Sequence, residues 1–123
     1  MIARILIVED QADIRRLIRW ALEDTGYRLH EAANGALALQ IVQAMRPDLM
    51  LIDVVMPGDI SGLDLCKQIR QDPTLAEIRL VVLSASAAPY EREQAMASGA
   101  DAFLAKPFSP AQLCEMIDEL LHA

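Results

Sequence analysis

The chain has 123 residues, of which 54% are hydrophobic and 24% are charged, and its formal net charge is −7. This composition is typical of one globular domain and excludes a disordered chain. The longest apolar runs are far shorter than the roughly 20 residues that a membrane-spanning helix needs, so we expect no membrane span. We therefore expect residues 1–123 to form a single domain around one hydrophobic core.

The basic residues are scattered along the chain, except for the group Arg15, Arg16 and Arg19. We interpret this group as the solvated face of a helix. An acidic chain without a basic stripe is a poor candidate for direct nucleic-acid binding. The N-terminal residues also lack the pattern of a secretory signal, so we expect a cytoplasmic protein.

In chain order, short apolar runs alternate with helical patterns. The first run, residues 3–8, precedes apolar residues with the spacing of one helix face: Ile14, Leu17, Ile18, Ala21 and Leu22. Residues 27–32 alternate between apolar and polar, which indicates a half-exposed strand. Asn34-Gly35 then opens a second helix, which must end before Pro47.

The second half of the chain continues this alternation. Further strands are expected at residues 48–53, 78–84 and 101–105. Helices are expected at residues 62–71, at residues 88–98 and after the N-cap pair Ser109-Pro110. Five strand–helix pairs in strict order predict an α/β domain, with helices on both faces of a parallel sheet.

In such a sheet, functional groups collect at the carboxyl ends of the strands. Polar residues end or follow four of the five predicted strands: Glu9 and Asp10, Asp53, Ser84, and Lys106 with Pro107. Asp53 is the strongest functional candidate, because a lone acid that ends a doubly buried strand is unfavourable without a partner. Asp10 as a helix cap and Ser84 as a turn cap stay open as structural alternatives.

The charges in this set predict a bound cation. Carboxylates that lie within about 5 Å of one another repel by about 3 kcal/mol per pair at an effective dielectric constant of about 20. Mg²⁺ suits an all-carboxylate site, because this hard ion keeps some of its water and also accepts a phosphate oxygen. Lys106 supplies a point charge for a phosphoryl oxygen, and Ser84 supplies a hydroxyl donor. The set therefore predicts a site that handles a phosphoryl group beside a metal, with a carboxylate as nucleophile.

The pattern as a whole resembles the CheY-like receiver domain of two-component response regulators. The motifs that carry the resemblance are Glu9-Asp10, Asp53 with Met56-Pro57, Ser84-Ala85 and Lys106-Pro107. Each motif alone is common, but their order and spacing over the whole chain are highly specific. The resemblance implies a flavodoxin-like (βα)5 fold, a three-layer sandwich whose five-stranded parallel sheet has the strand order 2-1-3-4-5.

The resemblance implies that Asp53 accepts a phosphoryl group from a sensor histidine kinase or a histidine phosphotransfer protein. It also implies that Asp10 and Asp53 bind Mg²⁺ through their side chains, and that Val55 does so through its backbone carbonyl. Glu9 matches the first acidic position of the family, which acts on the metal directly or through water.

By the same resemblance, Ser84 matches the hydroxyl residue that turns toward the phosphoryl group, and Lys106 matches the lysine that contacts it. The peptide bond before Pro107 is implied to be cis. Phe103 occupies the position of an aromatic residue that changes rotamer on activation. A core phenylalanine on a short strand is the alternative for Phe103, and both interpretations stay open.

The implied function is a signalling switch rather than turnover of an outside substrate. Self-phosphorylation and autodephosphorylation at Asp53 are the implied reactions. The resemblance implies that a partner or effector domain reads the face formed by the fourth helix, the fifth strand and the fifth helix. It also admits a phosphorylation-dependent homodimer.

Two other classes of protein stay open. A metal-dependent phosphatase with an aspartyl intermediate would characteristically carry a second aspartate two positions after the nucleophile, where this chain has Val55. A phosphorylation-independent interaction module would keep only the receiver fold. Such modules usually lose the acid pair or the lysine, and this chain retains both.

The segment from Asp53 to Gly62 departs from the family pattern. It reads DVVMPGDISG and is one residue longer than the usual receiver loop, with the extra residue near Asp59 or Ile60. We expect this residue to alter access to the site or contact with a partner.

Overall fold

A computed structural model describes residues 2–56 and 58–122. These residues contain one five-stranded parallel sheet in the order β2-β1-β3-β4-β5. The strands are β1 (Arg4–Val8), β2 (Arg28–Ala32), β3 (Leu49–Asp53), β4 (Arg79–Ser84) and β5 (Ala102–Ala105). The helices are α1 (Ala12–Leu22), the 3-10 turn η1 (Glu23–Thr25), α2 (Gly35–Met45), α3 (Gly62–Gln71), α4 (Pro89–Ala97) and α5 (Pro110–Leu121). The predicted flavodoxin-like fold and its strand order are confirmed.

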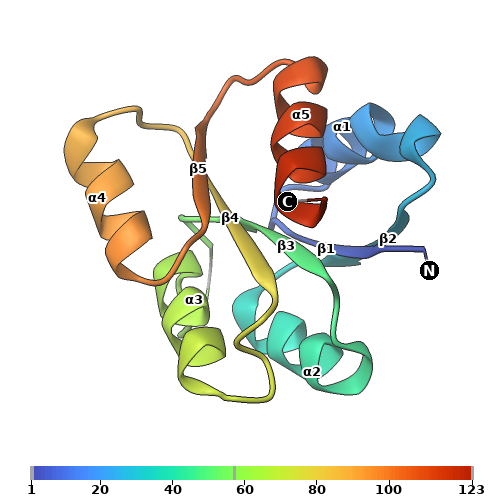
Figure 1. Ribbon diagram of the computed structural model, residues 1–123. Helices are drawn as coiled ribbons and strands as arrows, with labels where there is room; N and C mark the ends of the chain where they lie inside the picture. The colour runs from blue at the N-terminus through green and yellow to red at the C-terminus, as the bar shows by residue number, and fades with distance from the viewer. Residues whose placement is uncertain (1, 57, 123) are drawn as a thin grey trace.

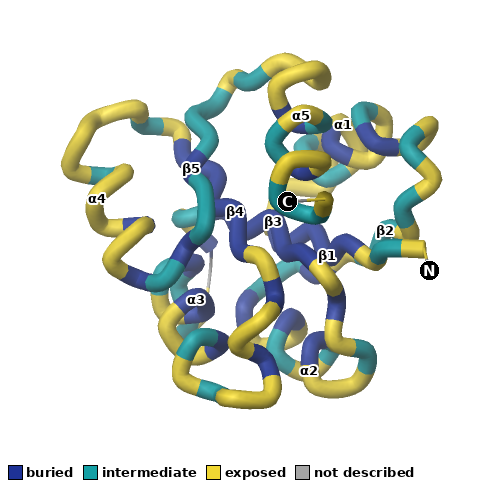
Figure 2. Tube along the Cα trace, viewed as in Figure 1, coloured by how far each residue is buried: buried dark blue, intermediate teal, exposed yellow. Residues whose placement is uncertain are grey.

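Helices cover both faces of the sheet, with α1 and α5 on one face and α2, α3 and α4 on the other (Figure 1). The central strand β3 is buried along its whole length, and Figure 2 shows the burial concentrated in the sheet. In the part of the chain that the structure describes, no helix has the length and apolar character needed to cross a bilayer.

The sheet divides the interior into two cores, where the sequence analysis expected one. Successive side chains of a strand point to opposite faces, so each strand contributes to both cores. Beneath α1 and α5, Ile5 and Ile7 of β1 pack in one cluster with Ile18 of α1. On the other face, Leu6 and Val8 of the same strand pack in a second cluster that includes residues of α2, α3 and α4.

The apolar face of α1 is narrower than its sequence pattern predicts. Ile18 and Leu22 are fully buried, but Leu17, which the sequence placed on the same apolar face, is 60% exposed. Neighbouring residues on an α-helix are separated by about 100° around its axis. Leu17 therefore lies to the side of the face that Ile18 buries, and it is exposed, as is Trp20.

At the amino end of the sheet, the Arg70 side chain of α3 joins three segments of the chain. Its guanidinium donates to the carbonyls of Ala76 and Ile78 at 2.9 and 2.7 Å and to the Gly99 carbonyl at 2.7 Å. It also forms an ion pair with Asp101 at 2.6 Å. The same Asp101 oxygen accepts a hydrogen bond from the backbone of β4. Arg70 thus connects α3 to the beginnings of β4 and β5.

We predict that Arg70→Met lowers the free energy of unfolding by about 2–4 kcal/mol, because Asp101 and three carbonyls lose a charged donor. Urea denaturation followed by the fluorescence of the single tryptophan measures this change. Lys67→Met, on an exposed position of the same helix, is the control and should change stability by less than about 0.5 kcal/mol. Equal stabilities of the two variants would contradict the role given to Arg70.

Near the amino end of β2, Tyr27 is tied to the last helix. Its hydroxyl donates to the carboxylate of Asp118 on α5. Burial and this hydrogen bond raise the pKa of Tyr27 to about 12. A tyrosine in an unfolded chain has a pKa of about 10. Folding therefore favours the protonated phenol, and this contribution to stability is complete below the unfolded pKa and lost as the pH rises toward 12.

We predict that wild type is more stable than Tyr27→Phe at about pH 9, by about 1 kcal/mol, because the variant lacks the bond to Asp118. The advantage should shrink at about pH 11.5, because the tyrosine of the unfolded chain is then ionised while the folded state still holds its proton, so folding must take up a proton. Urea midpoints of both proteins at the two pH values measure the difference, and effects of other groups cancel between them. An advantage that stays constant would show that Tyr27 does not titrate in this way.

Candidate functional site

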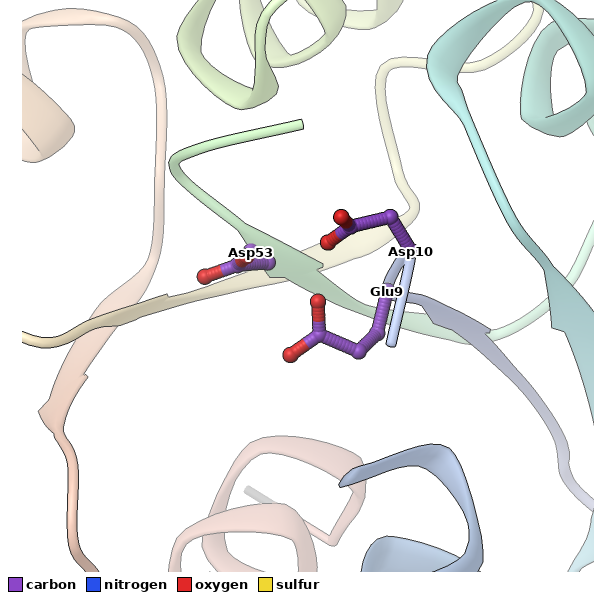
Figure 3. A group of neighbouring side chains, drawn as sticks. All are labelled: Glu9, Asp10 and Asp53. Carbon is purple, nitrogen blue, oxygen red and sulfur yellow. The ribbon is translucent and has the colours of Figure 1, made fainter. Parts of the chain in front are cut away.

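Three carboxylates lie together at the carboxyl end of the sheet. Glu9, Asp10 and Asp53 each place one carboxylate oxygen within 4.8 Å of the others (Figure 3). β1 and β3 are neighbouring parallel strands with Val8 opposite Ile52, so the residues that follow Val8 lie beside Asp53. The pairing of two strands thus brings together acids that are far apart in the sequence.

Lys106 connects two of these carboxylates. Its Nζ lies 2.9 Å from Glu9 Oε1 and 3.0 Å from Asp53 Oδ1. The residue follows β5, and its backbone N–H donates to the Ser84 carbonyl at 2.7 Å, which continues the β4–β5 pairing. From this position its side chain passes the end of β4 to reach β3 and β1. Lys106 therefore neutralises part of the charge of the acid cluster.

Burial and charge act together on the groups of the site. Burial alone would lower the pKa of Lys106, but hydrogen bonds to Glu9 and Asp53 and their charges outweigh it and raise this pKa. The pKa of Asp10 is raised first by desolvation and then by the neighbouring Glu9 carboxylate. Three ionised carboxylates and one ammonium leave an excess of two negative charges. The cluster therefore favours a further cation.

One carboxylate oxygen of this cluster has no hydrogen-bond partner among the described residues. Glu9 is 1% exposed, and within the described residues its Oε2 is buried without a hydrogen-bond partner. A buried acceptor without a partner is unfavourable, and each such atom in a native protein calls for an explanation. A ligand set made of carboxylate oxygens matches a hard divalent cation such as Mg²⁺. The residues present thus fit the predicted metal.

The structural alternatives for Asp10 and Ser84 have different outcomes. The N-cap residue of α1 is Gln11, so Asp10 does not cap this helix, and its carboxylate lies in the acid cluster. Ser84, at the end of β4, is 5% exposed, and its Oγ accepts a hydrogen bond from the Ser86 backbone at 3.1 Å. Ser84 therefore does form a turn contact, at the same end of the sheet as the acids.

The remaining predicted site residues lie around this cluster. Phe103 of β5 is 7% exposed and packs in the core beneath α2, α3 and α4, which is the position of a core phenylalanine. The Val55 side chain, two residues after Asp53, is 77% exposed. The Lys106–Pro107 peptide bond is cis, the conformation that the resemblance implies. The roles given to Phe103 and Val55 stay predictions.

The two ends of the segment between β3 and α3 lie next to each other. Gly62 N–H donates to the Val54 carbonyl at 3.1 Å, and a Cβ at Gly62 would lie 2.1 Å from the Asp53 carbonyl oxygen. Only glycine fits this approach of α3 to Asp53. Ile60 lies against Gly35, where a Cβ would come within 2.8 Å of it. The long segment thus packs on the start of α2, while Pro57 of the predicted Met-Pro motif lies outside the described residues.

The contact of Arg15 with the acid pair Glu9-Asp10 was not predicted from the sequence. Its Nη1 donates to the carbonyls of Glu9 at 2.7 Å and Asp10 at 3.2 Å, and its Nε donates to Glu31 of β2 at 3.0 Å. Arg19 Nε donates to the other oxygen of Glu31 at 2.7 Å. This hydrogen bond lowers the pKa of Glu31, burial opposes the shift, and the bond from Arg15 adds to it. The predicted solvated face was therefore wrong for Arg15, whose side chain is largely covered, whereas Arg16 and Arg19 are exposed as predicted. The spacing of four residues between Arg15 and Arg19 and an acid on the neighbouring strand were the available signal.

The comparisons with known proteins agree with this geometry. Residues 5–118 match the family described as the response regulator receiver domain. The chain is 37% identical over 118 residues to the phosphate regulon transcriptional regulatory protein PhoB of Pseudomonas aeruginosa, covering 96% of this chain and 51% of that protein. It is 36% identical over 119 residues to the transcriptional regulatory protein ResD of Bacillus subtilis, covering 97% of this chain and 48% of that protein. The chain thus spans about half the length of these curated relatives.

A solved structure of similar size shows the same architecture. The chemotaxis response regulator CheY4 of Vibrio cholerae superposes with a TM-score of 0.91 at 30% identity, covering 98% of this chain and 100% of that chain. Family match, sequence relatives and fold agree over nearly the whole length. The chain belongs to the response regulator receiver domain family, the signalling switches of two-component systems.

Proposed function

We propose that this chain is a phosphoacceptor switch in which Asp53 takes a phosphoryl group beside a bound Mg²⁺. The observation that carries the proposal is the acid cluster itself. Lys106 bridges Glu9 and Asp53, yet the cluster keeps an excess of negative charge, and Glu9 Oε2 is buried without a partner. A site that was only structural would be expected to balance its buried charges internally.

In the proposed reaction, an Asp53 carboxylate oxygen attacks the phosphorus of a phosphohistidine on a sensor kinase or phosphotransfer protein. The P–N bond breaks, and the histidine nitrogen keeps the electron pair. Asp10 and Asp53, with the Val55 carbonyl and Glu9, would hold Mg²⁺, which supplies charge neutralisation at the transferred oxygens. Hydrogen bonds between neighbouring strands hold the Asp53 backbone, so the nucleophile has a fixed position.

Lys106 and Ser84 are the groups that would respond to the new phosphoryl oxygens. The Lys106 ammonium already touches Asp53, and Ser84 lies at the end of the neighbouring strand. Charge-assisted bonds from both to a phosphoryl group would favour the activated state. Moving a two-state equilibrium from 1:99 to 99:1 needs about 5.5 kcal/mol. Phe103, packed beside the same strands, would change rotamer in this transition.

The partners follow from the family and remain part of the proposal. The upstream partner is a sensor histidine kinase or a histidine phosphotransfer protein in the cytoplasm. A downstream partner would read the face of α4, β5 and α5, where Tyr90 and Met96 of α4 are 67% and 41% exposed. The same face would serve a phosphorylation-dependent homodimer. The relatives named as transcriptional regulators are about twice as long as this chain, whereas CheY4 matches it over its full length. These lengths are thus compatible with an effector domain in the same polypeptide and also with an effector in another protein.

We predict that acetyl phosphate and Mg²⁺ together increase the intact mass of the chain by one phosphoryl group, and that EDTA abolishes the change. Asp53→Asn should form no adduct, because an amide is a poor nucleophile. Asp59→Asn is the matched control, since Asp59 is an exposed aspartate of the same loop, and should form as much adduct as wild type. An adduct on Asp53→Asn would disprove the assignment, and no adduct on wild type would favour the phosphorylation-independent module.

We further predict that Lys106→Met binds Mg²⁺ about tenfold more tightly than wild type, because a positive charge next to the ligand carboxylates is removed. The same variant should form the adduct more slowly, since the phosphoryl oxygens lose a cationic partner. Competition of Mg²⁺ against Mn²⁺, followed by the electron paramagnetic resonance of free Mn²⁺, measures the affinity. Lys67→Met removes a distant exposed lysine and should bind as wild type does. Unchanged or weaker binding by Lys106→Met would contradict the proposed electrostatics.

A further inference from the structure

Among the described side chains, Arg15 of α1 alone bonds both the backbone of the acid pair Glu9-Asp10 and a residue of β2. The residue belongs to the first half of α1, and its side chain is 20% exposed. One end of the guanidinium donates to the carbonyl oxygens of Glu9 and Asp10 at 2.7 and 3.2 Å. Its Nε donates to Glu31 Oε1 at 3.0 Å. Glu31 thus orients the guanidinium, which in turn holds two consecutive carbonyls.

These two carbonyls belong to Glu9 and Asp10, whose carboxylates lie in the acid cluster with Asp53. Glu9 is also held from the other side, because its N–H donates to the Ala32 carbonyl at 3.1 Å. Asp10 is exposed, and α1 begins without a side-chain N-cap. The direction of a side chain follows from the direction of its backbone. Arg15 therefore restrains where the Asp10 and Glu9 carboxylates can point.

We propose that Arg15 is a positioning residue that fixes the backbone of Glu9 and Asp10 so that their carboxylates converge with Asp53 on the cation. The proposal rests on the proposed function, because it concerns the same Mg²⁺. Groups that orient metal ligands from behind typically change metal affinity by about 10–100-fold when they are removed. In this chain the restraint acts on the ligand backbone rather than on the ligand side chain.

The sign of the effect separates positioning from simple electrostatics. Arg15 is a cation near a cation site, so its charge alone opposes Mg²⁺, and removing it would tighten binding. If Arg15 positions the ligands, its removal weakens binding instead. Arg15→Lys keeps the charge, but one ammonium cannot reproduce the planar fork that reaches Glu31 and both carbonyls. It should therefore also bind more weakly than wild type.

Arg19 provides a matched control within the same helix. Its Nε bonds the other oxygen of Glu31 at 2.7 Å, and its Nη2 donates to the Leu29 carbonyl at 3.1 Å, away from the acid pair. Arg19→Met thus removes the same charge from the same acid without touching Glu9 or Asp10. Any loss of stability caused by a weakened α1–β2 contact is common to both variants.

The experiment measures the affinity for Mg²⁺ by competition against Mn²⁺ in wild type, Arg15→Met, Arg15→Lys and Arg19→Met. Arg15→Met should bind about tenfold more weakly, Arg15→Lys should lie between it and wild type, and Arg19→Met should stay within about twofold of wild type. Adduct formation from acetyl phosphate by Arg15→Met should return to the wild-type rate at saturating Mg²⁺, because only the affinity is changed. Melting temperatures in EDTA verify that the variants are folded. Arg15→Lys provides the comparison with Arg19→Met if Arg15→Met does not fold.

Each outcome has a separate meaning. Equal or tighter binding by the Arg15 variants overturns the positioning role and leaves the proposed function intact. Equal weakening in Arg15→Met and Arg19→Met also overturns it, because the effect would then arise from the α1–β2 contact. A wild-type chain that binds no Mg²⁺ overturns the proposed function and this inference together.

Discussion

The electrostatic constraint on which the site depends is the presence of several carboxylates at the carboxyl end of one buried sheet. Glu9 and Asp53 are 1% and 7% exposed, so their charges are screened little by water and must be balanced within the molecule. Lys106 supplies part of this balance, and it reaches both acids only because β5 lies in the same parallel sheet as β1 and β3. Two hydrophobic cores hold that sheet in place, one on each face. The fold thus keeps like charges together that would separate in solution.

The polar groups at the two ends of the sheet differ in whether their hydrogen bonds are completed within the protein. At the amino end, Arg70 gives its hydrogen bonds to three carbonyls and to Asp101, and all of these partners belong to the protein. At the carboxyl end, Glu9 Oε2 is without a partner among the described residues. A ligand can therefore change bonds at the carboxyl end while the amino end keeps its own. This difference allows a local change of charge without loss of the fold.

Much of this arrangement follows from the sequence, and the exceptions share a cause. Apolar periodicity predicted the order of the elements and the bounds of α3, Gly62–Gln71. The rule that parallel strands end at the same level predicted that Glu9, Asp10 and Asp53 would meet. The exposure of Leu17 and the contacts of Arg15 were not predicted, because the side-chain direction on a helix depends on the elements packed beside it. The approach of Gly62 to Asp53 leaves no sequence signal beyond the glycine itself.

The hydrogen bond from Gly62 to Val54 has a consequence for how this protein can vary. The chain leaves the sheet at Val54 and returns to the same carbonyl at Gly62, so the intervening loop is closed at its base. Extra residues in a loop whose ends are already joined cost little, because closure entropy grows slowly with length. An extra residue near Asp59 or Ile60, as the sequence analysis expects, would therefore lengthen the loop without moving its joined ends. Changes in this loop can therefore alter the surface beside the site while the backbone of Asp53 and the start of α3 keep their positions.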